Sequence, residues 1–286
     1  MNNGALIFAH NNRDVDYALM AVISAGLAKK HLHIPVSLVS DESTIQWMKE
    51  SGSYSKAESI FDKIILTDRS DEGNTRYLAD GNEISVVPFL NADRYNAYNL
   101  TPYENTLLLD SDFLIFSDVL NNYWDNDEVL LAHSMSDIEG SRKGILDNWV
   151  SETGIHLYWA TTVMFKKNEI GRLFFELVNI VKQNYSYFAD LYRFNPNQYR
   201  NDVSFSVAKH ILDAYGSDKT VNLPPIKTVQ DKDILESVSS DGRLLFLIHD
   251  IMDVNKFSPV RIMGSDIHVM NKQSIVRNSE KLLELI

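Results

Sequence analysis

The segment Asn105-Thr-Leu-Leu-Leu-Asp-Ser-Asp-Phe-Leu-Ile-Phe116 decides the fold, because its apolar run ends in two aspartates one residue apart. A short, uninterrupted apolar run favours a buried strand of an α/β sheet. Open sheets of this kind bind ligands beyond the carboxyl ends of their strands. Carboxylates at such an end suit Mg²⁺ or Mn²⁺ and leave coordination positions for phosphate oxygens and water. The alternative is an ordinary turn, in which Asp is common, and the flanking strand makes a metal site the stronger interpretation.

The residues before this segment predict a mostly parallel sheet. The apolar run 5–9 ends in the polar loop 10–14, and a helical stripe follows from Val15, with Asp14 as its expected cap. A second strand at 35–39 stops at Ser40-Asp41. Strand, helix and strand in this order imply a right-handed crossover between parallel neighbours.

The rest of the chain continues this pattern as one domain. Further strands are predicted at 63–66, 84–87, 106–109, 129–132, 157–165 and 244–248, and helices at 91–100, 170–181, 202–215 and 279–285. The break at Leu223-Pro-Pro225 separates a core, 1–222, from an extension, 223–286, that is expected to complete the site as a closing tail. Weak periodicity beyond Gly264 predicts few buried contacts there until a ligand binds.

Composition narrows the function classes. With 286 residues and 44% hydrophobic content the chain can bury one large catalytic core. It has no cysteine, which excludes disulfides and thiolate metal sites. Its net charge of −12 disfavours, without excluding, a nucleic-acid partner. No apolar run of about 18 residues and no leader pattern is present, so we expect a cytoplasmic protein without a membrane span.

Four segments in order resemble the GT-A fold glycosyltransferases, and distantly the glycogenin and bacterial lipopolysaccharide galactosyltransferase group. They are Ala9-His-Asn-Asn12, Leu107-Leu-Leu-Asp-Ser-Asp112, Trp159-Ala-Thr-Thr-Val-Met-Phe-Lys-Lys167 and Ile267-His-Val-Met-Asn-Lys272. The likeness covers most of the chain and implies a Rossmann-like sheet flanked by helices. Two departures, Ala160-Thr-Thr162 in place of an Asn-Ser-Gly-like element and no Gly between His268 and Lys272, leave the sugar and the stereochemistry open.

The resemblance implies a Mn²⁺ or Mg²⁺ ion and a nucleoside diphosphate sugar donor, with UDP favoured. The expected metal ligands are Asp110, Asp112 and His268, and His249 is the rival histidine because it also ends a strand. Asp112 is also expected to act in catalysis.

Three groups of residues are expected around the donor and acceptor. Strand ends at His10, Asn11, Arg13 and Asp41 suit a base and ribose pocket. Arg94, Ser111 and Lys272 are expected at the donor, although a surface salt bridge would also explain Arg94 and a solvated side chain Lys272. Asp202 is expected near the sugar or acceptor, and helix capping is its alternative role.

The predicted function is metal-dependent transfer of a hexose or pentose to a hydroxyl acceptor such as a glycan. A virus-encoded enzyme that glycosylates a modified DNA base is an alternative. A nucleotidyltransferase is another, although the loop 10–14 lacks the glycines that such enzymes use to hold phosphates. A non-catalytic protein that binds sugar nucleotides is the third.

Overall fold

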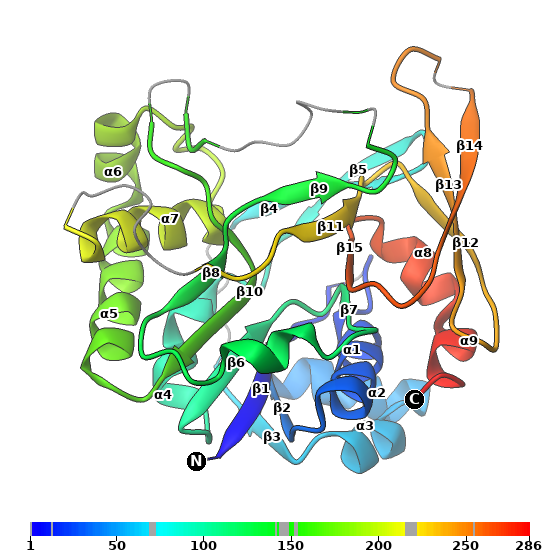
Figure 1. Cartoon of the computed structure of the whole chain (residues 1–286), viewed down its shortest axis with the longest axis horizontal. Coiled ribbons are helices and arrows are strands. Elements are labelled where there is room, and N and C mark those ends of the chain that lie inside the picture. The colour runs from blue at the N-terminus through cyan, green and yellow to red at the C-terminus, as the bar shows by residue number, and fades with distance from the viewer. Residues whose placement is uncertain are drawn as a thin grey trace.

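The central layer is a six-stranded sheet with the order β3-β2-β1-β6-β10-β8. The computed structural model describes residues 2–12, 14–68, 73–140, 142, 149–151, 154–214, 222–253 and 255–286 (Figure 1). β3, β2, β1 and β6 run parallel, and β10 is antiparallel to β6 and β8. The predicted α/β class with a mostly parallel sheet is therefore confirmed. The strands are β1 (Asn3–Phe8), β2 (Val36–Ser40), β3 (Lys63–Leu66), β6 (Asn105–Leu109), β8 (Leu130–Ala132) and β10 (Trp159–Lys166).

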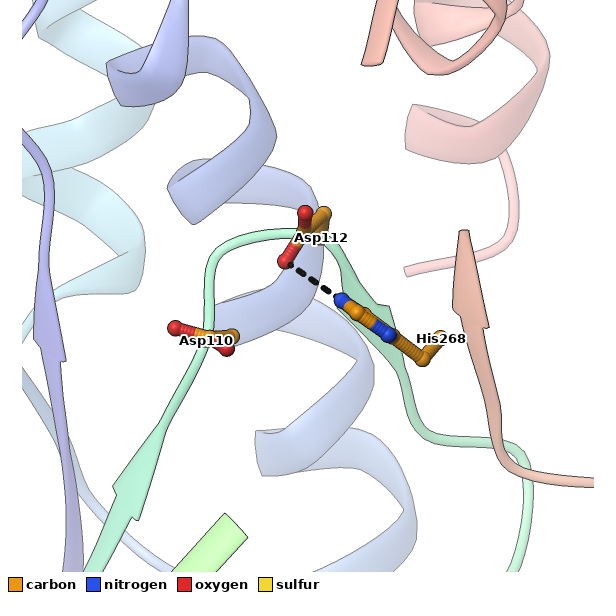
Figure 2. A group of neighbouring side chains, drawn as sticks. All are labelled: Asp110, Asp112 and His268. Carbon is orange, nitrogen blue, oxygen red and sulfur yellow. Dashed lines mark ion pairs between the residues drawn. The ribbon is translucent and has the colours of Figure 1, made fainter. Parts of the chain in front are cut away.

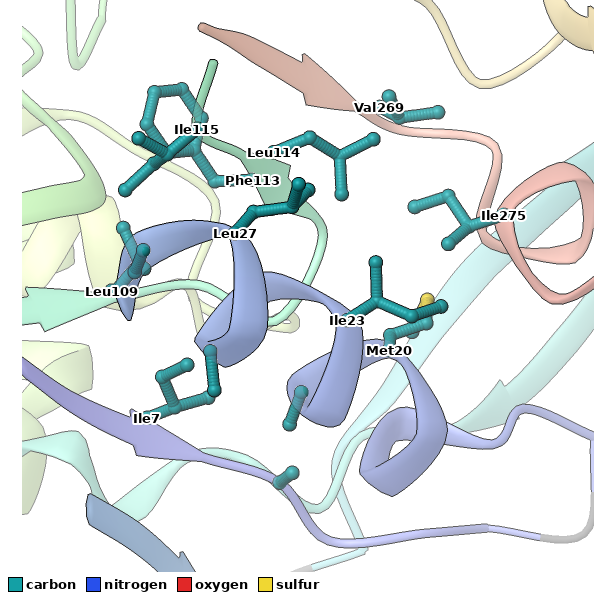
Figure 3. Close-up of a cluster of buried hydrophobic side chains, with 14 of the residues drawn as sticks. Ile7, Met20, Ile23, Leu27, Leu109, Phe113, Leu114, Ile115, Val269 and Ile275 are labelled. Carbon is teal, nitrogen blue, oxygen red and sulfur yellow. The ribbon is translucent and has the colours of Figure 1, made fainter. Parts of the chain in front are cut away.

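Alternating side chains of the central strands feed two cores, one on each face of the sheet. Ile7 and Leu109 pack with helix α1 (Tyr17–Leu32) in one core (Figure 3). Leu6 and Leu108 join the other core. The α1 side also carries α2 (Glu42–Ser51) and α3 (Tyr54–Ile60). The opposite face is covered by η1 (Asp93–Asn96), α4 (Ala97–Leu100), α5 (Glu169–Gln183), α6 (Tyr185–Tyr192) and α7 (Asn201–Leu212).

The start of α1 differs from the sequence prediction. Asp16 rather than Asp14 is the N-cap, and its side chain accepts a hydrogen bond from the Leu19 backbone N–H at 2.9 Å. Asn12 holds the preceding turn by accepting bonds from the backbone N–H groups of Asp14 and Val15. The cap moves two residues because this turn occupies the backbone of Asp14.

The predicted strand at 84–87 does not belong to the central sheet. It forms β5 (Glu83–Pro88), which pairs with β4 (Thr75–Asp80) in a separate two-stranded hairpin. Its side chains are mostly exposed, and Ile84 and Val86 keep 59% and 61% of their surface accessible. The prediction that this strand belongs to the central sheet is therefore wrong, because the apolar run gave no sign of its pairing with β4.

The tail is built into the fold rather than lying loosely on it. β15 (Ile267–Val269) pairs parallel with β11 (Ile226–Val229) and antiparallel with β7 (Phe113–Leu114), in a sheet completed by β9 (Met135–Asp137). Ile267, Val269 and Ile275 have no exposed surface. The expectation of few buried contacts beyond Gly264 is therefore wrong, because this short strand is covered on both edges.

The remaining C-terminal elements surround this strand. β12 (Ile234–Val238), β13 (Leu244–His249) and β14 (Phe257–Ile262) form an antiparallel sheet, and α8 (Lys272–Arg277) and α9 (Ser279–Leu283) pack near α1. β13 and α9 match the predicted strand and helix. A short 3₁₀ helix, η2 (Val119–Tyr123), follows β7. In the part of the chain that the structure describes, no helix is long and apolar enough to cross a membrane.

Candidate metal and donor site

The two aspartates lie on a turn that three elements hold in place. Beyond the end of β6, the backbone N–H of Asp110 donates to the Thr161 carbonyl of β10 at 2.9 Å. The Asp112 carbonyl accepts a bond from the Val269 N–H at 3.0 Å. Ser24 of α1 donates to the Phe113 carbonyl at 2.9 Å. The turn is therefore fixed by the sheet, by α1 and by the tail strand.

The tail brings His268 to the aspartates. His268 is paired with Phe113 across β15 and β7, and its Nε2 lies 3.4 Å from Asp112 Oδ1 (Figure 2). One ligand atom from each of Asp110, Asp112 and His268 lies within 4.8 Å of the others. His268 Nδ1 is buried and has no hydrogen-bond partner among the described residues. Two carboxylates and an imidazole that converge in this way fit a divalent cation of the Mn²⁺ type.

Cationic side chains lie against both carboxylates. Lys272 Nζ is 2.7 Å from Asp112 Oδ2, and Arg94 Nη1 is 2.6 Å from Asp110 Oδ1. Burial would raise the pKa of Asp112, but Lys272 and His268 more than offset it and hold that pKa well below its usual value. Burial raises the pKa of Asp110, with Arg94 acting in the opposite direction. The pKa values of the two aspartates are therefore shifted in opposite directions, upward for Asp110 and downward for Asp112.

Arg94 is buried rather than part of a surface salt bridge. Only 3% of the residue is exposed, so the surface salt bridge considered as the alternative role of Arg94 is ruled out. Its Nη1 contacts Asp110, whereas Nε and Nη2 are buried without a hydrogen-bond partner in the described part of the chain. Buried guanidinium N–H groups that lack partners favour an anionic ligand, because leaving them unpaired is costly.

A cavity of about 370 Å³ opens over the aspartates. Its wall carries four cationic side chains and three carboxylates, so the local charge opposes the net charge of −12. The sequence-predicted residues that line it are Arg94, Asp110, Ser111, Asp112, Asp202, His268 and Lys272.

None of the four residues predicted to bind the nucleoside is found in the wall of this cavity, and one of them is not among the described residues. His10 bonds Asn91 through its backbone N–H at 2.9 Å, and Asn11 accepts from the Ala18 N–H at 2.8 Å near the start of α1. Asp41 caps α2 by accepting from the Thr44 N–H. None of these three lines the cavity. Arg13 lies outside the described residues, and the nucleoside assignments stay predictions.

Asp202 and His249 can now be placed. Asp202 lies in the first turn of α7, and Arg200 binds both of its carboxylate oxygens, at 3.1 and 2.5 Å. Its carboxylate is thus charge-compensated at the cavity wall. His249 ends β13 away from the cavity, and its backbone N–H donates to Asp233 at 2.9 Å. The structure therefore brings His268, and not His249, to the aspartates.

Sequence reasoning missed Arg76, which β4 carries to the cavity wall. Burial acts to lower the pKa of Arg76, but Tyr17, Asp112 and Asp110 raise it by more. Its guanidinium also lies 5.1 Å from the centre of the Phe89 ring. Nothing in the local pattern marked this arginine, because its position depends on a hairpin that is recognisable only with both strands paired.

Comparisons with known proteins found matches among solved structures only at low sequence identity. No protein-family model and no curated protein matches the chain. The apo-form glycosyltransferase GlyE of Streptococcus pneumoniae TIGR4 matches with a TM-score of 0.42 and 13% identity, over 78% of this chain and 45% of that one. This chain therefore spans under half the length of GlyE.

Two further matches cover similar shares of the chain. The galactosyltransferase LgtC in complex with donor and acceptor sugar analogs matches with a TM-score of 0.43 and 15% identity, over 72% of this chain and 70% of that one. Staphylococcus aureus TarS matches with a TM-score of 0.34 and 15% identity, over 74% of this chain and 34% of that one.

Proposed function

We propose that this chain is a glycosyltransferase that moves a sugar from a nucleoside diphosphate, UDP being favoured, to a hydroxyl acceptor such as a glycan. One observation carries the proposal. Asp110 and Asp112 at the end of β6 converge with His268 of β15 in one cationic cavity. His268 lies 156 positions after Asp112 in the chain, and its convergence with the two aspartates makes a chance turn motif a poor explanation.

The cluster suits Mn²⁺ or Mg²⁺ held by Asp110, Asp112 and His268. When bound, the ion would neutralise charge on the departing diphosphate. Because Lys272 lies 2.7 Å from Asp112, it is already placed to meet an anion beside the ion. Arg94 lines the same cavity, and its buried Nε and Nη2 groups have no hydrogen-bond partner among the described residues. These side chains would bind and orient a diphosphate from two sides.

The sugar and acceptor are proposed to bind toward Asp202. Because Arg200 compensates its charge, this carboxylate suits a hydrogen bond to a sugar or acceptor hydroxyl. Trp159 and Tyr77 also line this cavity and offer apolar faces to a sugar ring. The hairpin that carries Arg76 and Tyr77 forms part of the same wall and helps to exclude water.

The test is hydrolysis of UDP-sugars without acceptor, measured as UDP release with and without Mn²⁺. Asp112→Asn should lower metal-dependent turnover by at least about 100-fold, because it removes a metal ligand. Asp127→Asn is the matched control, since this carboxylate is 82% exposed in an ion pair with Lys166. Equal turnover in both variants would overturn the proposal.

Product identity separates the alternatives. A nucleotidyltransferase would release pyrophosphate from UTP and a sugar phosphate, and would not release UDP from a UDP-sugar. A non-catalytic protein would bind UDP-sugars without turnover. Glycans and DNA with hydroxylated bases, offered as acceptors to the same enzyme and donor, would then identify the acceptor class.

A further inference from the structure

The wall of the cavity carries one more cationic side chain than carboxylates. Each carboxylate already has its own cation: Asp110 pairs with Arg94, Asp112 with Lys272 and Asp202 with Arg200. The remaining cation is Arg76 of β4, which forms no ion pair with a described residue. Because charges that leave water are normally paired, a cation that the chain itself does not balance favours a negatively charged group of a ligand.

The pleat of the β4–β5 hairpin directs Arg76 toward the domain rather than to solvent. Alternate residues of a strand share a face, so Arg76 lies on the same face as Leu78, and Val87 of β5 is its partner across the hairpin. Leu78 and Val87 are buried in the core on the α1 side of the sheet, whereas Tyr77 on the other face is exposed. Arg76 is therefore the member of the inner face that lies at the cavity.

Two contacts hold the guanidinium group of Arg76 in place. The Asn12 side-chain amide donates to the Pro88 carbonyl at 2.9 Å and so ties the end of β5 to the loop that precedes α1. The ring of Phe89, the next residue, has its centre 5.1 Å from the Arg76 guanidinium. Such a contact uses the flat face of the guanidinium, and the N–H groups at its edge remain able to donate to a ligand.

The charge of Arg76 acts on the proposed metal and donor site. Burial would lower the pKa of Arg76, but Tyr17, Asp112 and Asp110 raise it by more. In the proposed transfer, the bond between the anomeric carbon of the sugar and the diphosphate oxygen breaks, and its electron pair stays on that oxygen. The acceptor oxygen forms the new bond to the carbon, and its proton passes to solvent. The diphosphate therefore gains one negative charge as it leaves, and an unbalanced cation can neutralise it.

We propose that Arg76 is a further catalytic residue, which binds the diphosphate and neutralises the charge that the diphosphate gains on departure. This inference rests on the proposed function and gives the β4–β5 hairpin a chemical role beyond that of a wall. A cation that the fold holds in position binds the departing diphosphate more strongly than the intact donor, because the donor carries one negative charge fewer. Arg76 should therefore speed the chemical step more than it tightens donor binding.

Calorimetry with UDP and with UMP at saturating Mn²⁺ tests the contact with the terminal phosphate. Arg76→Gln should weaken UDP binding by about 10- to 100-fold, the effect expected for a lost hydrogen bond to a charged group. UMP lacks that phosphate and should bind to the variant as tightly as to the wild type, which also shows that the variant is folded. Arg261→Gln, at an exposed position of β14 outside the cavity wall, is the matched control and should leave both affinities unchanged. Equal weakening of UDP and UMP, or no weakening of either, would overturn the proposal.

Single-turnover hydrolysis of the UDP-sugar that the wild type uses separates the chemical step from binding. Arg76→Gln should lower the rate at saturating donor by about 10- to 100-fold, and should change the donor concentration that gives half of that rate by less than about threefold. Arg76→Lys keeps the charge but not the planar group and should recover part of the rate. A variant that loses only donor affinity, or loses nothing, would refute this inference alone. A wild type that neither binds UDP nor releases it from UDP-sugars would overturn the proposed function and this inference together.

Discussion

Replacing Lys272 by Met should change metal binding and donor binding in opposite directions. In the structure Lys272 Nζ lies 2.7 Å from Asp112 Oδ2, and both side chains are nearly buried, at 5% and 7% exposed. Lys272 thus already compensates the charge of a carboxylate that the cation is proposed to use. Without the ammonium group, Asp112 faces the cation unpaired, so Mn²⁺ should bind more tightly to the free protein.

The size of the effect follows from the contact that is lost. A hydrogen bond to a charged group contributes about 1.5–3 kcal/mol. If the ion has to displace that contact, its removal should tighten Mn²⁺ binding by roughly 10- to 100-fold. UDP binding at saturating Mn²⁺ should weaken by a similar factor, because the variant no longer offers a positive charge to the diphosphate.

Calorimetric titration of the free protein with Mn²⁺, followed by titration with UDP, measures both quantities. Lys281→Met is the control, because Lys281 forms an exposed ion pair with Glu284 remote from the cavity. Lys272→Arg keeps the charge and should resemble the wild type in metal affinity. Weaker or unchanged Mn²⁺ binding in Lys272→Met would show that Lys272 does not compete for Asp112.

Three further predictions concern stability. Arg142→Met should lower the free energy of unfolding in urea by about 3–5 kcal/mol, because it leaves the buried carboxylates of Asp137 and Asp233, which Arg142 pairs at 2.6 and 2.8 Å, without a partner. The control Lys29→Met breaks a more exposed pair with Asp62 and should cost under about 1 kcal/mol. Equal losses in the two variants would contradict the reasoning. Gly171→Ala should lower the melting temperature, because its new Cβ would lie 2.3 Å from the Lys166 carbonyl oxygen. An unchanged melting temperature would show that the backbone at the start of α5 can shift to accept the methyl group without loss of stability. A hydrogen bond from Arg277 lowers the pKa of Asp80, with burial opposing, so the stability from this tether is present above pH 3.8 and is lost as the pH falls below it. Hydrogen exchange in the β4–β5 hairpin should therefore rise below pH 3.8, and protection that is independent of pH would argue against the tether.

The sequence predicted those parts of the fold in which a local pattern coincides with burial. β6 is an apolar run closed by Asp110, and all five of its residues are buried in the centre of the sheet. α5 matches the helix predicted at 170–181. Phe174, Val178 and Val181 of its predicted inner face are buried, whereas Ile170 and Leu173 of that face are exposed. The resemblance to glycosyltransferases also selected His268 and Lys272, which the fold brings to Asp112.

Local pattern failed where a residue's role depends on a distant partner. The run at 84–87 has the composition of a core strand, yet it lies exposed in a hairpin with β4. Arg76 carried no signal because only this pairing brings it to the cavity. The tail seemed weakly held because β15 is three residues long, although two neighbouring strands bury it completely.

By itself, then, the sequence determined the α/β class and the carboxylate pair at the end of β6, because apolar periodicity and strand ends are local properties. The tertiary structure alone decided that His268 rather than His249 meets the aspartates and that Arg94 is buried against Asp110. It also decided that the tail supplies an inner strand of the four-stranded sheet. Those outcomes depend on contacts between residues far apart in the chain. Their energies arise from desolvation and charge pairing, which exist only once the strands are side by side.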